Sequence, residues 1–346
     1  MNSSAAKLEL RPLPHFTDSL MYPPNMDYDY FSANADFNFN YLNTGFDINN
    51  CWWLSEFALL AYEHPRFIKL TLESVLKVQS EIVIKGNFQG FVAYCDEWIV
   101  VSFRGTRIKS LGMLKDLSFG AMIKPVQISE YGMVHKGFLD SYIQIWLDEK
   151  QGVKRIVQQL LTENPARATW FTGHSMGGAL AVLAAQDLKC PHPVYTFGCP
   201  KLGNEAFVQS LEIQHFRLVH RNDIVVRFPL PFSKYTSKHI YRLDGKVLQI
   251  TSNMVSQGNI DDKSILQYLY DMWKSNRRQV MKLVFWTIPI TWIKHLMRGH
   301  VITFINILSD SIYEIILKDM MDHAPVLYSI CAYNNMLLQK MATLKE

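Results

Sequence analysis

The feature that most constrains this chain is a serine between two glycines, at residues 173–177 (Gly-His-Ser-Met-Gly). A short apolar run at 168–171 precedes it and a run rich in Ala and Leu follows, which predicts a buried strand and then a helix. Because so sharp a turn crowds the backbone, Gly173 and Gly177 remove Cβ atoms where strand and helix would collide. The pattern predicts a nucleophile elbow, with Ser175 exposed above a helix N-terminus that favours negative charge.

The elements around this turn predict an α/β fold. The chain has 346 residues and is 49% hydrophobic, which suits one large domain with embellishments or two domains. Strands and helices alternate around the serine, which favours a mostly parallel sheet with helices on both faces and catalytic groups at the carboxyl ends of its strands. The expected strands are 89–95, 98–103, 168–171, 194–197, 216–220, 240–243 and 247–250, and the expected helices are 50–63, 67–78, 134–147, 153–161 and 179–188.

Composition predicts three parts along the chain. Residues 1–48 are read as an N-terminal arm, because 36–46 alternates polar and aromatic residues that could wrap over a domain; a disordered tail is the alternative. Residues 49–346 are read as the main domain. Within it, about 255–320 is an unusually apolar helical insertion.

Charge and cysteine usage indicate which partners and which cellular compartment suit the chain. The net charge of +4 is weak and forms no basic stripe, so no nucleic-acid partner is expected. The five cysteines are scattered, without CxxC spacing, which indicates reduced thiols and neither disulfides nor a zinc site. We find no signal peptide and no apolar run of about 20 residues. These observations predict a cytoplasmic protein, with peripheral membrane attachment and export without a cleavable signal as open alternatives.

A serine nucleophile needs an imidazole base and an orienting carboxylate, which in this architecture follow it in the order Ser, Asp or Glu, His. Asp223 fits the carboxylate, because it comes three residues after His220, the end of a predicted strand. Asp244 is the weaker alternative, since Asp244-Gly245 resembles a turn pair.

Four histidines follow that aspartate. His239 opens a predicted strand and suits a structural role, and His295 lies in the apolar basic segment. His323 lies at the break between two predicted helices, where a loop can return the ring to the sheet edge. On these grounds His323 is favoured only modestly over His300.

The oxyanion formed during acyl transfer needs backbone N–H donors. One is expected from Met176, directly after the nucleophile, and the other from the loop after the strand 98–103. Thr106 in that loop could add its hydroxyl.

The chain resembles the class 3, or fungal-lipase-like, lipases of the α/β-hydrolase superfamily. The segments that carry the resemblance occur in the family's order over about 50–335: 99–106, 134–138, 173–178, 197–204, 220–223, and Asp322-His323 with Tyr328. The resemblance implies an α/β-hydrolase fold with Ser175, Asp223 and His323 as the catalytic triad. It also implies Thr106 and Met176 as the oxyanion hole, and a lid at about 107–113 anchored by Asp116.

We therefore expect a serine carboxyl-ester hydrolase that acts on acyl lipids, of triacylglycerol lipase or phospholipase A1 type, through an acyl-enzyme and without metal or cofactor. A non-catalytic lipid-binding protein on a hydrolase fold is the alternative, although such proteins typically lack a triad member. In the insertion, Trp286, Trp292 and flanking cations suit a peripheral membrane contact through 279–298. A cap over the acyl pocket, or a place in the core, explains these residues equally well.

Overall fold

The computed structural model describes residues 9–14, 27–107, 125–127, 132–221, 223–227, 239–244, 247–250 and 321–344. Several predictions lie outside the described residues: the lid beyond Arg107 with Asp116, the insertion at 255–320 with its segment 279–298, and His295 and His300.

The described chain is organised on one eight-stranded sheet, in the order β1-β2-β3-β6-β7-β8-β9-β10. Its strands are β1 (Gln79–Lys85), β2 (Phe88–Tyr94), β3 (Trp98–Phe103), β6 (Ala168–His174), β7 (Val194–Phe197), β8 (His215–His220), β9 (His239–Asp244) and β10 (Val247–Ile250). Neighbours from β3 to β9 are parallel, and antiparallel strands flank them at both ends. The predicted mostly parallel sheet is therefore confirmed. A separate antiparallel pair joins β4 (Pro125–Gln127) to β5 (Met133–His135).

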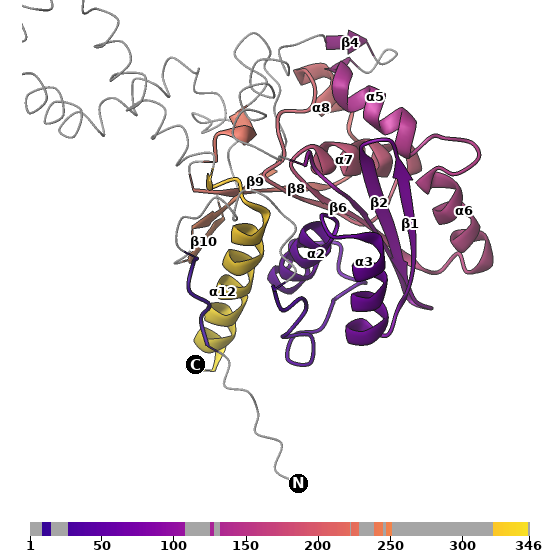
Figure 1. Ribbon diagram of the computed structural model, residues 1–346. Coiled ribbons are helices and arrows are strands. Elements are labelled where there is room, and N and C mark those ends of the chain that lie inside the picture. Colours follow the sequence, from indigo (N-terminus) through magenta and orange to yellow (C-terminus); the bar gives the residue numbers. More distant parts are fainter. Residues whose placement is uncertain are drawn as a thin grey trace, which may run out of the picture.

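Helices cover both faces of the sheet (Figure 1). One face carries α2 (Ile48–Leu60), α3 (Pro65–Thr71), the π-helix η1 (Leu72–Leu76) and α12 (Pro325–Thr343). The other carries α5 (Lys136–Ile145), α6 (Val153–Glu163), α7 (Met176–Leu188) and α8 (Glu205–Ser210), and a short 3-10 helix, η3 (Val225–Arg227), follows β8. The long helix expected at 67–78 is two shorter helices, α3 and η1. The first begins at Pro65, which suits a first helical position, and the second ends before Lys77, whose φ is +60°.

The described residues of the N-terminal segment pack against α2 and α12. Phe31 is fully buried, and its ring lies 5.5 Å from that of Trp53. The Arg11 amide donates to Asn334 Oδ1 at 2.8 Å, and the Arg11 guanidinium lies 3.9 Å over the Tyr333 ring. Aromatic and polar contacts thus hold these described residues against the two helices. The division at residue 48 stays a prediction.

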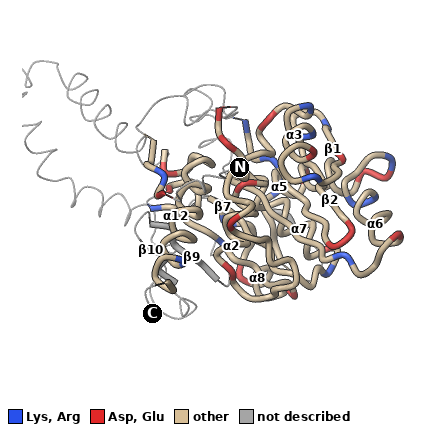
Figure 2. Tube along the Cα trace, turned by 90° about the horizontal axis from the view of Figure 1, so that it is seen from below, with Lys and Arg blue, Asp and Glu red and all other residues tan. Residues whose placement is uncertain are grey.

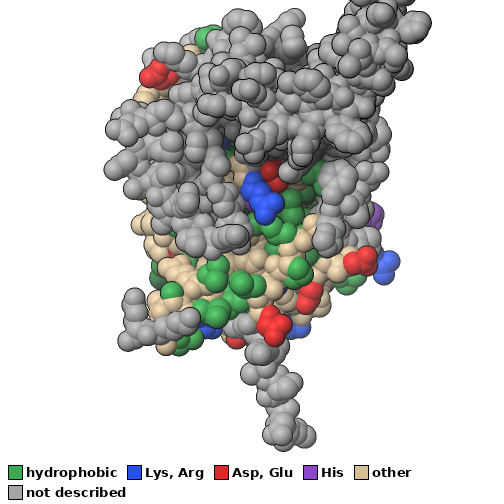
Figure 3. Space-filling model, turned by 90° about the vertical axis from the view of Figure 1, so that its left-hand side faces the viewer, with side chains coloured by type: hydrophobic (Ala, Val, Ile, Leu, Met, Phe, Trp, Pro, Cys, Tyr) green, Lys and Arg blue, Asp and Glu red, His purple; other side chains and the backbone are tan. Residues whose placement is uncertain are grey.

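The surface of the described chain carries charged side chains of both signs and some exposed apolar side chains. Lysines and arginines alternate with acidic residues over α3, β1 and α6 (Figure 2). On the side where α12 lies, hydrophobic side chains gather on the lower half of the face (Figure 3). The exposed apolar residues of the described chain include Leu10, Met341 and Leu344. No helix within the described ranges combines the length and apolar character that crossing a bilayer requires.

Candidate active site

The serine turn joins β6 to α7 with the geometry expected of a nucleophile elbow. Ser175 has φ +57° and ψ −130°, a backbone conformation that a residue with a Cβ atom rarely adopts. A Cβ atom on Gly173 would lie 2.3 Å from the carbonyl carbon of Gly177, and one on Gly177 would lie 2.0 Å from the carbonyl oxygen of Phe103. Both glycines are therefore required by close backbone approach: Gly173 where β6 meets α7, as predicted, and Gly177 where α7 meets the end of β3.

Strand register brings the carboxyl ends of four strands to this edge of the sheet. Phe103 at the end of β3 pairs with Gly173, and His174 at the end of β6 pairs with Phe197. Phe197 pairs in turn with Leu218 of β8. The residues that follow β3, β6, β7 and β8 consequently lie next to one another, although they are far apart in the sequence.

Asp223 and His323, which are 100 residues apart, form a buried pair at this edge. His323 Nδ1–H donates to Asp223 Oδ2 at 2.7 Å, and the two residues are 7% and 0% exposed. The same carboxylate oxygen accepts from the Tyr328 hydroxyl at 2.6 Å, and the Val225 amide donates to Oδ1 at 2.8 Å. Burial and the adjacent carboxylate raise the pKa of Tyr328, so its hydroxyl keeps the proton that it donates.

The structure places the other described candidates elsewhere. Asp244 pairs with Val247 in the β9–β10 hairpin, and His239 opens β9 opposite Phe216. Both residues therefore lie in the backbone ladders of the sheet.

Gly198, directly after β7, is a site residue that the sequence argument missed. Its φ is +59°, and a Cβ atom there would lie 2.8 Å from His323 Nδ1 and 2.9 Å from Asp223 Oδ2. Any side chain would therefore crowd the hydrogen bond between imidazole and carboxylate. The available signal was a glycine at the end of a predicted strand, in a segment that already carried the family resemblance.

Ser175 comes close to this pair through its neighbour His174. The His174 ring lies 4.4 Å from the His323 ring, centroid to centroid, and His174 Nε2 lies 2.7 Å from the His323 carbonyl oxygen. Among the described residues, Ser175 Oγ and the His323 ring share no hydrogen bond of their own. Catalytic hydrogen bonds are often long in enzymes without substrate and tighten when it binds.

The loop after β3 passes over the elbow, as an oxyanion loop must. A Cβ atom on Gly105 would lie 2.6 Å from the His174 carbonyl oxygen and 2.9 Å from Ser175 Cβ. Thr106 Oγ1 lies 3.7 Å from the sulfur of Met176, the first residue of α7. Thr106 and Met176 are thus neighbours, next to the nucleophile candidate.

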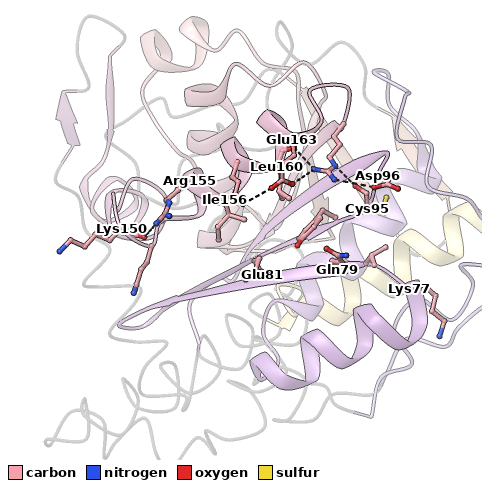
Figure 4. A pocket seen from close by; sticks show the side chains of 16 residues that line it. Lys77, Gln79, Glu81, Cys95, Asp96, Lys150, Arg155, Ile156, Leu160 and Glu163 are labelled. Carbon is pink, nitrogen blue, oxygen red and sulfur yellow. Dashed lines mark hydrogen bonds and ion pairs between the residues drawn. The ribbon is translucent and has the colours of Figure 1, made fainter.

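A cavity of about 690 Å³ lies elsewhere, between α6 and the β1–β2 edge (Figure 4). Arg167 crosses it: its Nε donates to the Cys95 carbonyl at 2.9 Å and its Nη1 to the Leu160 carbonyl at 2.8 Å, with Glu163 and Asp96 as ion-pair partners. A hollow lined by satisfied charges does not suit an acyl chain, and none of the triad candidates lines it.

Comparison with known proteins gives a family match over the centre of the chain. Residues 100–233 match the model of the family described as lipase (class 3). The chain is 32% identical over 182 residues to a secreted mono- and diacylglycerol lipase of Fusarium solani, covering 50% of this chain and 53% of that protein. It is 30% identical over 194 residues to a chloroplastic phospholipase A(1) of Arabidopsis thaliana, covering 48% and 42%. The chain thus spans about half the length of these relatives.

A crystal structure of a lipase from Rhizopus microsporus var. chinensis is 27% identical, with 58% of this chain and 76% of that one covered. The TM-score is 0.47, which is too low to bear on function.

The comparisons contradict the predicted cytoplasmic location, because two similar fungal proteins are named as secreted lipases. The cysteine argument for a reducing compartment was weak for a physical reason. Although all five cysteines are free thiols, four of them are buried, and a buried thiol behaves as a small apolar side chain in any compartment.

Proposed function

We propose that the chain, whose residues 100–233 match the lipase (class 3) family, is a serine carboxyl-ester hydrolase acting on acyl lipids, of triacylglycerol lipase or phospholipase A1 type. The observation that carries the proposal is the 2.7 Å bond between His323 and Asp223, at the same sheet edge as the strained Ser175 turn. Burying a carboxylate is costly unless several donors satisfy it, and Asp223 has three. A non-catalytic lipid-binding protein would have no use for that arrangement.

In the proposed mechanism, Ser175 Oγ attacks the ester carbonyl carbon while His323 Nε2 takes the hydroxyl proton. The amides of Thr106 and Met176 stabilise the oxyanion. His323 passes its proton to the leaving alcohol, and an acyl group remains on Ser175. Water then attacks that ester by the same route, which releases the fatty acid and restores the serine. Asp223 stabilises the imidazolium at each step.

The domain division is part of this proposal. The N-terminal arm (1–48) covers the domain 49–346, and the apolar segment 255–320 is an insertion between the carboxylate and the base. The length of chain between Asp223 and His323 supports this division, because a short connection would be enough to join two residues of one site.

A fluorophosphonate probe followed by peptide mapping tests the assignment, because such probes phosphonylate only an activated serine. We expect one labelled residue, Ser175, in the native chain and none after denaturation. A series of p-nitrophenyl esters from acetate to palmitate, with a diacyl phospholipid as competitor, then defines the acyl and headgroup class. Ser210→Ala is the matched control and should label as the wild type does, since the Ser210 hydroxyl donates to the Phe207 carbonyl within its own helix, α8. No labelling, or labelling at another serine, would contradict the proposal.

Peripheral membrane contact through 279–298 is proposed from sequence alone, on the strength of Trp286, Trp292 and the cations around them. We expect the wild type to co-sediment with anionic liposomes, and a chain lacking 279–298 to remain in the supernatant. The double variant Trp286→Ser/Trp292→Ser, checked by circular dichroism, guards against loss of folding in the deletion. Equal co-sedimentation of all three proteins would exclude membrane contact through 279–298, and a cap or a core segment would remain as the role of these residues.

A further inference from the structure

Two buried residues behind the elbow, His174 and Tyr62, lie in a continuous line of hydrogen bonds. Both are 2% exposed. His174 Nε2 lies 2.7 Å from the His323 carbonyl oxygen, and His174 Nδ1 lies 2.8 Å from the Tyr62 hydroxyl. The same hydroxyl lies against the backbone of Gly105, where a Cβ atom would come within 2.2 Å of it. The line therefore runs from the oxyanion loop to the backbone of the candidate base.

With a neutral His174 ring, only one arrangement of protons satisfies both hydrogen bonds of this line. The carbonyl oxygen of His323 can only accept, so His174 Nε2 carries a proton and donates it. In a neutral ring His174 Nδ1 is then bare and accepts the Tyr62 hydroxyl proton.

The neutral ring is what the surroundings favour. Burial lowers the pKa of His174, and the neighbouring His323 lowers it further. The titratable groups around the ring are Tyr62, from the turn after α2, His323, and Tyr328 of α12, whose ring centroid lies 5.7 Å away. A second positive charge so close to His323 would oppose formation of the imidazolium that the mechanism needs.

We propose that His174 and Tyr62 are positioning residues, which hold the backbones of His323 and Gly105 in register with Ser175; this rests on the proposed function. Asp223 holds the His323 ring at Nδ1, and His174 holds the same residue at its carbonyl. Together they leave the ring one orientation. Displacement of a catalytic group by about 1 Å is enough to lower kcat by roughly a hundredfold.

Two substitutions of His174 separate its two hydrogen bonds. The amide nitrogen of glutamine can replace Nε2–H, whereas the amide oxygen of asparagine can replace Nδ1. We expect His174→Gln to keep kcat for p-nitrophenyl butyrate within about threefold of the wild type. We expect His174→Asn, which loses the bond to the His323 carbonyl, to lower kcat roughly 10- to 100-fold. KM should stay within about twofold in both, because neither hydrogen bond involves the substrate.

Tyr62→Phe provides the second variant, because it removes one hydroxyl and leaves the ring in place. We expect kcat to fall roughly tenfold with KM unchanged, more than in His174→Gln, because this hydroxyl also lies against the backbone of Gly105 in the loop after β3. Wild-type kcat in both His174→Asn and Tyr62→Phe would overturn the proposal, as would equal losses in His174→Gln and His174→Asn.

Nuclear magnetic resonance of the full chain with ¹⁵N-labelled histidine tests the arrangement without any turnover. Long-range ¹H–¹⁵N spectra should show His174 protonated at Nε2 only between about pH 5.5 and 8, assigned by its absence from His174→Gln. A ring protonated at Nδ1, or at both nitrogens, would overturn the proposal even if the enzyme were active. If these spectra agree but Ser175 does not react with the fluorophosphonate, the proposed function fails and the hydrogen-bond line stands.

Discussion

Ser175→Ala is expected to lose hydrolysis of p-nitrophenyl acyl esters by about a millionfold, the loss seen when the nucleophile of such a triad is removed. The change removes one oxygen atom. Alanine meets the same φ of +57° as serine and adds no atom to the crowded turn. Stability should therefore be nearly unchanged, which thermal denaturation followed by circular dichroism will check.

Ser210→Ala is again the matched control and should hydrolyse these esters at the wild-type rate. If Ser175→Ala itself turned over at the wild-type rate, the nucleophile assignment would be wrong. Activity in both variants would direct attention to a different serine.

Asp223→Asn is expected to lower kcat by about ten thousandfold with little change in KM. The three contacts of this carboxylate all come from donors: His323 Nδ1–H, the Tyr328 hydroxyl and the Val225 amide. An asparagine has one oxygen and one NH₂ group. In one orientation its NH₂ group faces the Val225 N–H, so that two donors meet. The other orientation presents NH₂ to His323 and favours the tautomer with its proton on Nε2, which cannot accept from the serine.

Tyr328→Phe separates this effect from simple loss of packing, because it removes one donor and leaves the carboxylate. We expect a loss of roughly tenfold or less in kcat. Comparable kcat values in Asp223→Asn and Tyr328→Phe would show that the negative charge does not matter. An active Asp223→Asn would mean that another carboxylate orients the base.

Local patterns predicted the elements that depend on local forces. The strand β6, the turn at Ser175 and the helix α7 were readable because a run of apolar residues, two glycines and an Ala-rich segment each restrict the backbone directly. The hairpin between β2 and β3 was readable from the polar pair Asp96-Glu97. The edge strand β1 was missed, since most of its side chains are not buried and it lacks a continuous apolar run.

Sequence alone determined that a serine turn between two glycines follows a buried strand, and that an aspartate and a histidine in the order expected of a triad lie downstream. The sequence could not decide among histidines, because distance along a chain carries no information about which loops meet at a sheet edge. Among the described residues the tertiary structure joins His323 to Asp223, since parallel register aligns the ends of β6, β7 and β8, and the turn before α12 brings His323 onto Asp223. Gly198 and the His174–Tyr62 line have the same origin, because their roles arise only when distant backbones come within hydrogen-bond distance.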